Sequence, residues 1–149
     1  MAFKATSLIA ESAFQEIRRR AASLKSFLQT ERALMVQATV DSRVPLAVIQ
    51  YLGDVIPRFN SLASTPGLAA YARDQVNDQA YDVVAEFTAM RNACQAALDN
   101  LLAVFPKDGN GFLLYQTMNA SGVISTRTFT AAQVAAAVAL IDAVIATID

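Results

Sequence analysis

A group of basic residues near the N-terminus is the part of the sequence best suited to recognise a charged partner. It comprises Arg18, Arg19, Arg20, Lys25 and Arg32. Arg18, Lys25 and Arg32 are seven residues apart, so they form one stripe if this region is helical. The stripe is either a solvated face on which Glu16 pairs with Arg20, or a docking surface for an acidic partner. Nucleic-acid contact is a third interpretation, disfavoured because no aromatic residues accompany the stripe to stack bases.

A series of acidic residues follows in the middle of the chain. Asp74, Asp78, Asp82 and Glu86 are spaced by four. On a continuous helix these like charges would destabilise one another. A helix break at Asn77-Asp78 would relieve this, with Asp78 at a helix cap and Asp82 near a first turn. Alternatively, the series faces the basic stripe, within one subunit or between two. A divalent-cation site is the least favoured interpretation, because nothing resembles a calcium-binding loop.

The residue types that are missing exclude several kinds of catalysis. The chain has no His and one Cys, so Ser–His–Asp and Cys–His nucleophiles cannot form. Zinc sites of the usual Cys/His kinds and di-iron sites built on Glu-x-x-His are excluded for the same reason. Cys94 lies in an apolar helical pattern and is interpreted as a small buried hydrophobe. We therefore expect no enzymatic activity, no cofactor and no metal.

Long helical segments are predicted to position these charges. Apolar residues recur at spacings of three and four over residues 5–37, which predicts one long helix. A second helix starts near Asp41 or Ser42, and Pro57 is expected to kink or end it. Thr65-Pro66 is a typical helix start. The region from there to about residue 105 is predicted to form helices over 66–76 and 79–105.

The pattern then changes from helical to alternating. Residues 112–118 and 123–129 are predicted to form two strands joined by a loop that contains Gly122. Thr130 and Gln133 match a capping box at the start of a last helix. The predicted fold is mainly α: a bundle of four to five helices with a β-hairpin at about 112–129 before the C-terminal helix. Residues 1–149 are expected to form a single domain from which the long N-terminal helix is able to project.

The last helix is apolar almost all round. One face carries Val134, Val138, Ile141, Ile145 and Ile148, and two large apolar residues, Leu140 and Val144, lie off it. A helix of this kind is buried on more than one side. It is either the central helix of the core or a helix that contacts a neighbouring copy. Its shortness and the charge of Asp142 argue against a membrane span.

The overall composition favours association with other proteins. The 149 residues are 54% apolar and 17% charged, against about 45–50% and about 25% in an ordinary soluble domain. The net charge of −1 hides an asymmetry, because residues 1–43 are net basic and residues 44–149 are net acidic. A total charge close to zero provides little repulsion between copies.

Several segments resemble small, uncharacterised structural proteins of tailed phages and prophages. They are TPGLAAYA at 65–72, YDVVAEFTAM at 81–90, FPKD at 105–108, SGV at 121–123 and RTFTAAQ at 127–133. The resemblance covers about residues 40–149 and involves helix caps and turns. It implies a virion component, made in the cytoplasm of the bacterial host. Such a component would be present as a ring or adaptor at the head–tail junction, tail or baseplate.

Two functions follow as expectations. The first is a bacteriophage structural protein whose partners are other copies of itself and neighbouring virion proteins. The second is a small helical regulatory module that binds a host protein or nucleic acid. In the first case the basic and acidic series and the last helix would form the protein interface. The predicted interface residues are Arg18, Arg19, Arg20, Lys25, Arg32, Asp78, Asp82, Glu86, Val138, Ile141 and Ile145.

Overall fold

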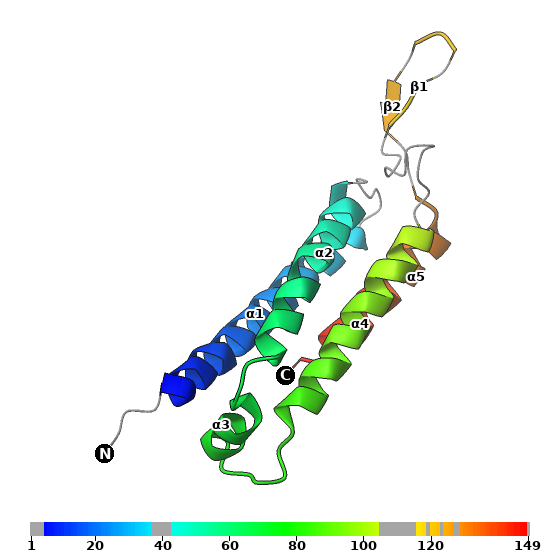
Figure 1. Ribbon diagram of the computed structural model, residues 1–149. Coiled ribbons are helices and arrows are strands. Elements are labelled where there is room, and N and C mark those ends of the chain that lie inside the picture. The colour runs from blue at the N-terminus through cyan, green and yellow to red at the C-terminus, as the bar shows by residue number, and fades with distance from the viewer. Residues whose placement is uncertain are drawn as a thin grey trace.

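The chain forms a mainly helical bundle, as predicted (Figure 1). The computed structural model describes residues 5–36, 43–104, 116–118, 120–122, 124–126 and 129–148. Within these ranges the helices are α1 (Ala5–Met35), α2 (Arg43–Ala63), α3 (Leu68–Gln75), α4 (Val83–Val104) and α5 (Ala131–Ile145). None of the helices in these ranges combines the length and apolarity needed to cross a membrane.

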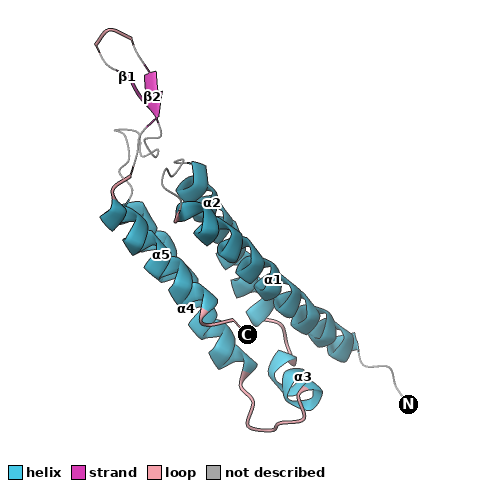
Figure 2. Ribbon diagram, turned by 180° about the vertical axis from the view of Figure 1, so that it is seen from behind, coloured by secondary structure: helices cyan, strands magenta, loops and turns pink. Residues whose placement is uncertain are grey.

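The helices pack as neighbouring pairs around one apolar core. α1 lies against α2, and α4 lies against α5, as the two opposite views show (Figures 1 and 2). α2 also packs on α4, α1 also packs on α5, and the short α3 contacts both α1 and α4. The predicted seam of α1 is buried at Phe14, Ile17, Leu24 and Leu28, because their spacing of three and four places them on one face.

α2 continues past Pro57 to Ala63, so of the two outcomes expected at this residue, a kink or an end of the helix, the end is wrong. A proline at this position removes the backbone hydrogen bond to the carbonyl of Gly53 and crowds that carbonyl. Both Pro57 and Gly53 are exposed, so water can hydrate the freed carbonyl. The opposite face of α2 is buried at Leu52, Val55 and Phe59, and this burial outweighs the local cost.

α3 begins two residues later than Thr65-Pro66 predicts. Its N-cap is Gly67, whose φ of 77° lies in the left-handed region. Glycine adopts that conformation without the steric cost that a side chain would bring. Thr65 instead accepts a weak backbone hydrogen bond from Leu68 at 3.4 Å. The predicted start therefore forms the turn before the helix.

Two short strands lie within the range of the predicted hairpin. β1 (Gln116–Met118) and β2 (Ile124–Thr126) pair antiparallel, with Thr117 opposite Ser125. Figures 1 and 2 place them beyond one end of the helices. Residues 112–115, 119, 123 and 127–128 lie outside the described ranges, so a complete hairpin over 112–129 is not part of the described structure.

The predicted capping box at the start of α5 is present. The Thr130 hydroxyl accepts a hydrogen bond from the Gln133 backbone N–H at 3.1 Å, and the Gln133 side chain accepts one from the Thr130 backbone N–H at 2.9 Å. The Gln133 amide also donates to the carbonyl of Val104 at 3.2 Å. This last bond ties the beginning of α5 to the end of α4.

Candidate interaction surfaces

Two of the three consecutive arginines share one carboxylate within α1. Arg19 pairs with Glu16 one turn earlier, and Arg20 Nε lies 2.6 Å from Glu16 Oε1. The contact of Arg20 is an ion pair without the alignment of a hydrogen bond. The solvated-face interpretation therefore describes Arg19 and Arg20, and the pairing of Glu16 with Arg20 is confirmed.

Arg32 pairs with a residue that sequence reasoning did not assign to the interface. Its Nε and Nη2 donate to Asp142 Oδ1 and Oδ2 of α5, at 2.6 and 3.2 Å. The hydrogen bond and the charge of Asp142 raise the pKa of Arg32. Both side chains remain more than 40% exposed, so the pair lies at the edge of the α1–α5 contact. Lys25, the middle residue of the stripe, is half-buried.

The acidic series is interrupted, as one of the three interpretations predicted. The helix breaks between α3 and α4, and Asn77 has a φ of 52°. Asp82 caps α4, because its Oδ1 accepts from the backbone N–H of Ala85 at 3.0 Å. Asp78 forms a turn by accepting from Ala80 at 2.9 Å. The cap residue is thus Asp82 and not Asp78, because the predicted helix over 79–105 begins at Val83.

Within the described ranges, no three acidic, Cys or His side chains lie close enough to hold a metal ion. Asp74 at the end of α3 accepts a hydrogen bond from the Gln79 amide at 3.3 Å. The first three members of the series are therefore used locally, in caps and turns. Of the four, only Glu86 lines a groove that residues of α1 also line.

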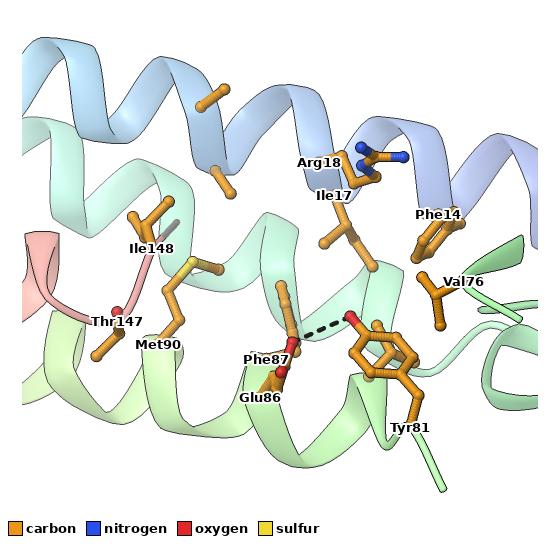
Figure 3. A pocket seen from close by; sticks show the side chains of 13 residues that line it. Phe14, Ile17, Arg18, Val76, Tyr81, Glu86, Phe87, Met90, Thr147 and Ile148 are labelled. Carbon is orange, nitrogen blue, oxygen red and sulfur yellow. Dashed lines mark hydrogen bonds between the residues drawn. The ribbon is translucent and has the colours of Figure 1, made fainter. Parts of the chain in front are cut away.

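Arg18 and Glu86 line one groove between α1 and α4. The groove has a volume of about 500 Å³, and Tyr81, Val76, Thr147 and Ile148 also contribute to its walls (Figure 3). The Arg18 guanidinium lies 5.6 Å from the centre of the Phe14 ring, where the ring face attracts a cation. Glu86 accepts a hydrogen bond from the Tyr81 hydroxyl at 3.0 Å.

The floor of this groove is apolar. Phe14, Ile17, Val83, Phe87 and Met90 line it and are each less than a tenth exposed. Arg18 and Glu86 are both exposed at its edge. The ion pairs of the described residues join Arg19 and Arg20 to Glu16 and Arg32 to Asp142, so neither Arg18 nor Glu86 is neutralised by one of them. The groove therefore presents both signs of charge beside a buried apolar surface.

The predicted interface residues of α5 divide between core and surface. Ile141 is 1% exposed and belongs to the core, with Ala137 and Val144. Val138 and Ile145 are half-buried at the margin of that core. The buried face of α5 is thus rotated from the predicted one, although the helix does pack against α4 and α1.

The sequence did not predict the contacts that Asp142, Phe14 and Tyr81 make on these surfaces. Asp142 carried a usable signal, because it is the one charged residue in a long apolar helix and such a charge needs a partner or solvent. No sequence signal indicates the contacts of Phe14 and Tyr81. The contact of Phe14 depends on a side-chain rotamer, and the contact of Tyr81 depends on the turn before α4.

Cys94, Tyr71 and Tyr51 are each packed against other side chains of the bundle. Cys94 is fully buried, and this burial raises the pKa of its thiol to about 12. Tyr71 packs edge-on against Phe14 at 5.8 Å, and burial together with the charge of Glu11 raises its pKa. Phe27 stacks on Tyr51 with ring centres 4.2 Å apart. These surroundings favour packing over chemistry at each position.

Comparison of the chain with protein families, curated proteins and solved structures found no match.

Proposed function

We propose that this chain is a structural component of a bacteriophage virion that assembles with copies of itself. A ring or adaptor at the head–tail junction, tail or baseplate is the arrangement that the sequence resemblance implies. The surface of the helical bundle supports an assembly role, because apolar and charged side chains at the edges of its helices remain accessible to solvent. Under this proposal the chain functions through the surfaces by which it contacts other copies and neighbouring proteins.

The observation that carries the proposal is the incomplete burial of α5. Only Ala137, Ile141 and Val144 of this helix are fully covered. The other large apolar residues of residues 134–148 remain half-buried; they are Val134, Val138, Leu140, Ile145 and Ile148. Apolar surface of this kind is stabilised further when another chain removes it from water. Contact with a neighbouring copy would supply that cover.

The alternative function, a regulatory module that binds a host protein or nucleic acid, has less support. It rests on the basic cluster, and Arg19, Arg20 and Arg32 are all paired with carboxylates of the same chain. A salt titration with duplex DNA tests the nucleic-acid version, since phosphate contacts make affinity fall steeply with salt concentration. Binding that weakens in this way would favour the alternative.

The virion assignment is tested by peptide analysis of purified phage particles. Particles are prepared from lysates of the host that carries this gene, and the peptides of the chain are quantified against those of the major capsid protein. We expect a fixed copy number per particle that survives repeated density-gradient purification. Loss of the peptides during purification, with the protein remaining in the soluble lysate, would contradict the virion assignment.

A further inference from the structure

We propose that the groove between α1 and α4 is a contact surface for a second copy of this chain. In this contact Arg18 of one copy faces Glu86 of the other. The inference rests on the proposed function, because it names the surface by which copies associate. Of the half-buried apolar residues of 134–148, the groove includes only Ile148, so most of the surface that carries the proposed function lies outside it.

The first argument is the apolar character of the groove and its margin. Its floor is closed by buried Phe14, Phe87 and Met90, while Val76 at its edge is 44% exposed. Val84, which follows the groove residue Val83 on α4, is 39% exposed. Protein contact surfaces combine an apolar centre with a polar rim, and this groove has both.

The second argument is charge. Arg18 is held over the Phe14 ring and Glu86 is held by the Tyr81 hydroxyl, so both charged groups are oriented, and no ion pair among the described residues neutralises either. Both lie at the solvent-exposed rim (Figure 3). A surface that carries one cation and one anion is complemented by a surface with the same pair. A second copy of the chain supplies that pair.

The reciprocal arrangement fits the symmetry of common assemblies. In a two-fold contact each residue pair occurs twice, so Arg18 of each copy meets Glu86 of the other. The groove by itself is smaller than the roughly 800 Å² per partner that stable interfaces bury. The contact must therefore extend beyond it, and Val84, the exposed neighbour of Val83 on α4, is an apolar residue outside the groove.

The test is a pair of charge reversals, used singly and mixed. R18E places two anions at the groove, and E86R places two cations there. Each variant alone is expected to self-associate about tenfold more weakly than the wild type at low salt, because like charges face each other at two symmetric positions. An equimolar mixture of the two variants restores opposite charges at both positions. We expect mixed assemblies that contain one variant each, counted by native mass spectrometry.

Matched controls separate this contact from a general effect of charge. R58E reverses an exposed arginine of α2, and D99R reverses an exposed aspartate of α4; neither residue lines the groove. Both control variants are expected to associate like the wild type. Circular dichroism of all four variants checks that the helical fold is retained.

Four results would overturn the inference. The first is that R18E and E86R associate as strongly as the wild type, and the second is that their mixture fails to associate. The third is that the control variants weaken association equally. The fourth is that the groove binds a small molecule, which both groove variants lose while the mass of the assembly stays the same. In the first case the proposed function stands and another surface, such as α5, carries it. A wild-type chain that stays monomeric would instead contradict the proposed function itself.

Discussion

At the scale of single residues, Asp82 explains why acidic residues spaced by four are tolerated at 74–86. Its carboxylate accepts the Ala85 backbone N–H at the start of α4. Negative charge is favoured at that end of a helix. Glu86 lies in the first turn of the same helix and gains from the same effect. The four acidic residues therefore lie on both sides of a helix boundary and do not form one continuous acidic face.

The cap at Asp82 leads to a prediction about stability. Replacing Asp82 by Ala removes the acceptor for one backbone N–H and is expected to lower the free energy of unfolding by about 1 kcal/mol. Asp82→Asn is the matched control, because asparagine caps about as well. Urea unfolding followed by circular dichroism measures both. Equal stability of the Ala variant and the wild type would show that Asp82 is not the cap.

Burial of Cys94 leads to a prediction about pH. The thiol titrates near its ordinary pKa of 9.0 in the unfolded chain and at about 12 in the folded chain. Between these values the unfolded state binds fewer protons, so the free energy of unfolding falls as the pH rises, by up to about 1.4 kcal/mol per pH unit. Well below pH 9 the thiol is protonated in both states, and this contribution does not change.

Urea unfolding from pH 8 to 10.5 measures this slope in the wild type and in Cys94→Ala. The alanine variant is less stable at every pH, because its side chain leaves a cavity. It is expected to show a shallower decline than the wild type above pH 9. Parallel declines in the two proteins would mean that the thiol does not contribute.

At the scale of elements, α2 shows how packing overrides local preference. Pro57 lies inside the helix, yet the helix continues because its apolar face is buried and Gly53, whose carbonyl loses its hydrogen bond, is an exposed residue. The local cost is still present in the folded state, since proline is about 3 kcal/mol less favourable than alanine inside a helix.

Pro57→Ala is therefore expected to stabilise the protein. The helix regains one hydrogen bond, and part of the gain is offset by the greater freedom of the unfolded chain, which leaves a net increase of about 2 kcal/mol in the free energy of unfolding. Thermal and urea denaturation measure this increase. A decrease would show that the proline is needed for the shape of α2.

Gly53→Ala probes the same segment without restoring that hydrogen bond. A Cβ at Gly53 meets nothing within 4 Å, so the variant is expected to gain about 1 kcal/mol from helix propensity alone. Destabilisation by this variant would mean that the Gly53 carbonyl and the Pro57 ring leave no room for a side chain on this face.

The helices were predictable because their apolar periodicity is strong. The helix predicted over residues 5–37 is observed at Ala5–Met35, and the break within the acidic series is observed as well. Details that depend on tertiary contacts were not predictable. In α5 nearly every position is apolar, so periodicity could not show that Ala137 and Val144 would be buried while Val138 and Ile145 stay half-exposed.

The candidate site was predictable only as separate charges. The arginine cluster and the acidic series were visible in the sequence, but their partners were not. Arg32 pairs with Asp142, 110 residues away, and Arg18 shares a groove with Glu86 only because α1 and α4 face each other there. Neither relation follows from residue spacing along the chain.

At the scale of the whole molecule, the Arg32–Asp142 pair links the first helix to the last. Replacing Asp142 by Asn removes the negative charge while preserving the size of the side chain. We expect faster amide hydrogen exchange in α5 at low salt. The difference from the wild type should shrink at high salt, because both groups are exposed and salt screens their attraction. Unchanged exchange at low salt would show that the pair does not hold α5 in place.

We propose that this chain works by associating with its own copies. Sedimentation equilibrium of the purified 149-residue chain over a wide concentration range tests this most directly. We expect a mass that rises from the monomer value of 16.0 kDa to a defined multiple as concentration increases. A mass that stays at 16.0 kDa at every concentration, in low and in moderate salt, would contradict it.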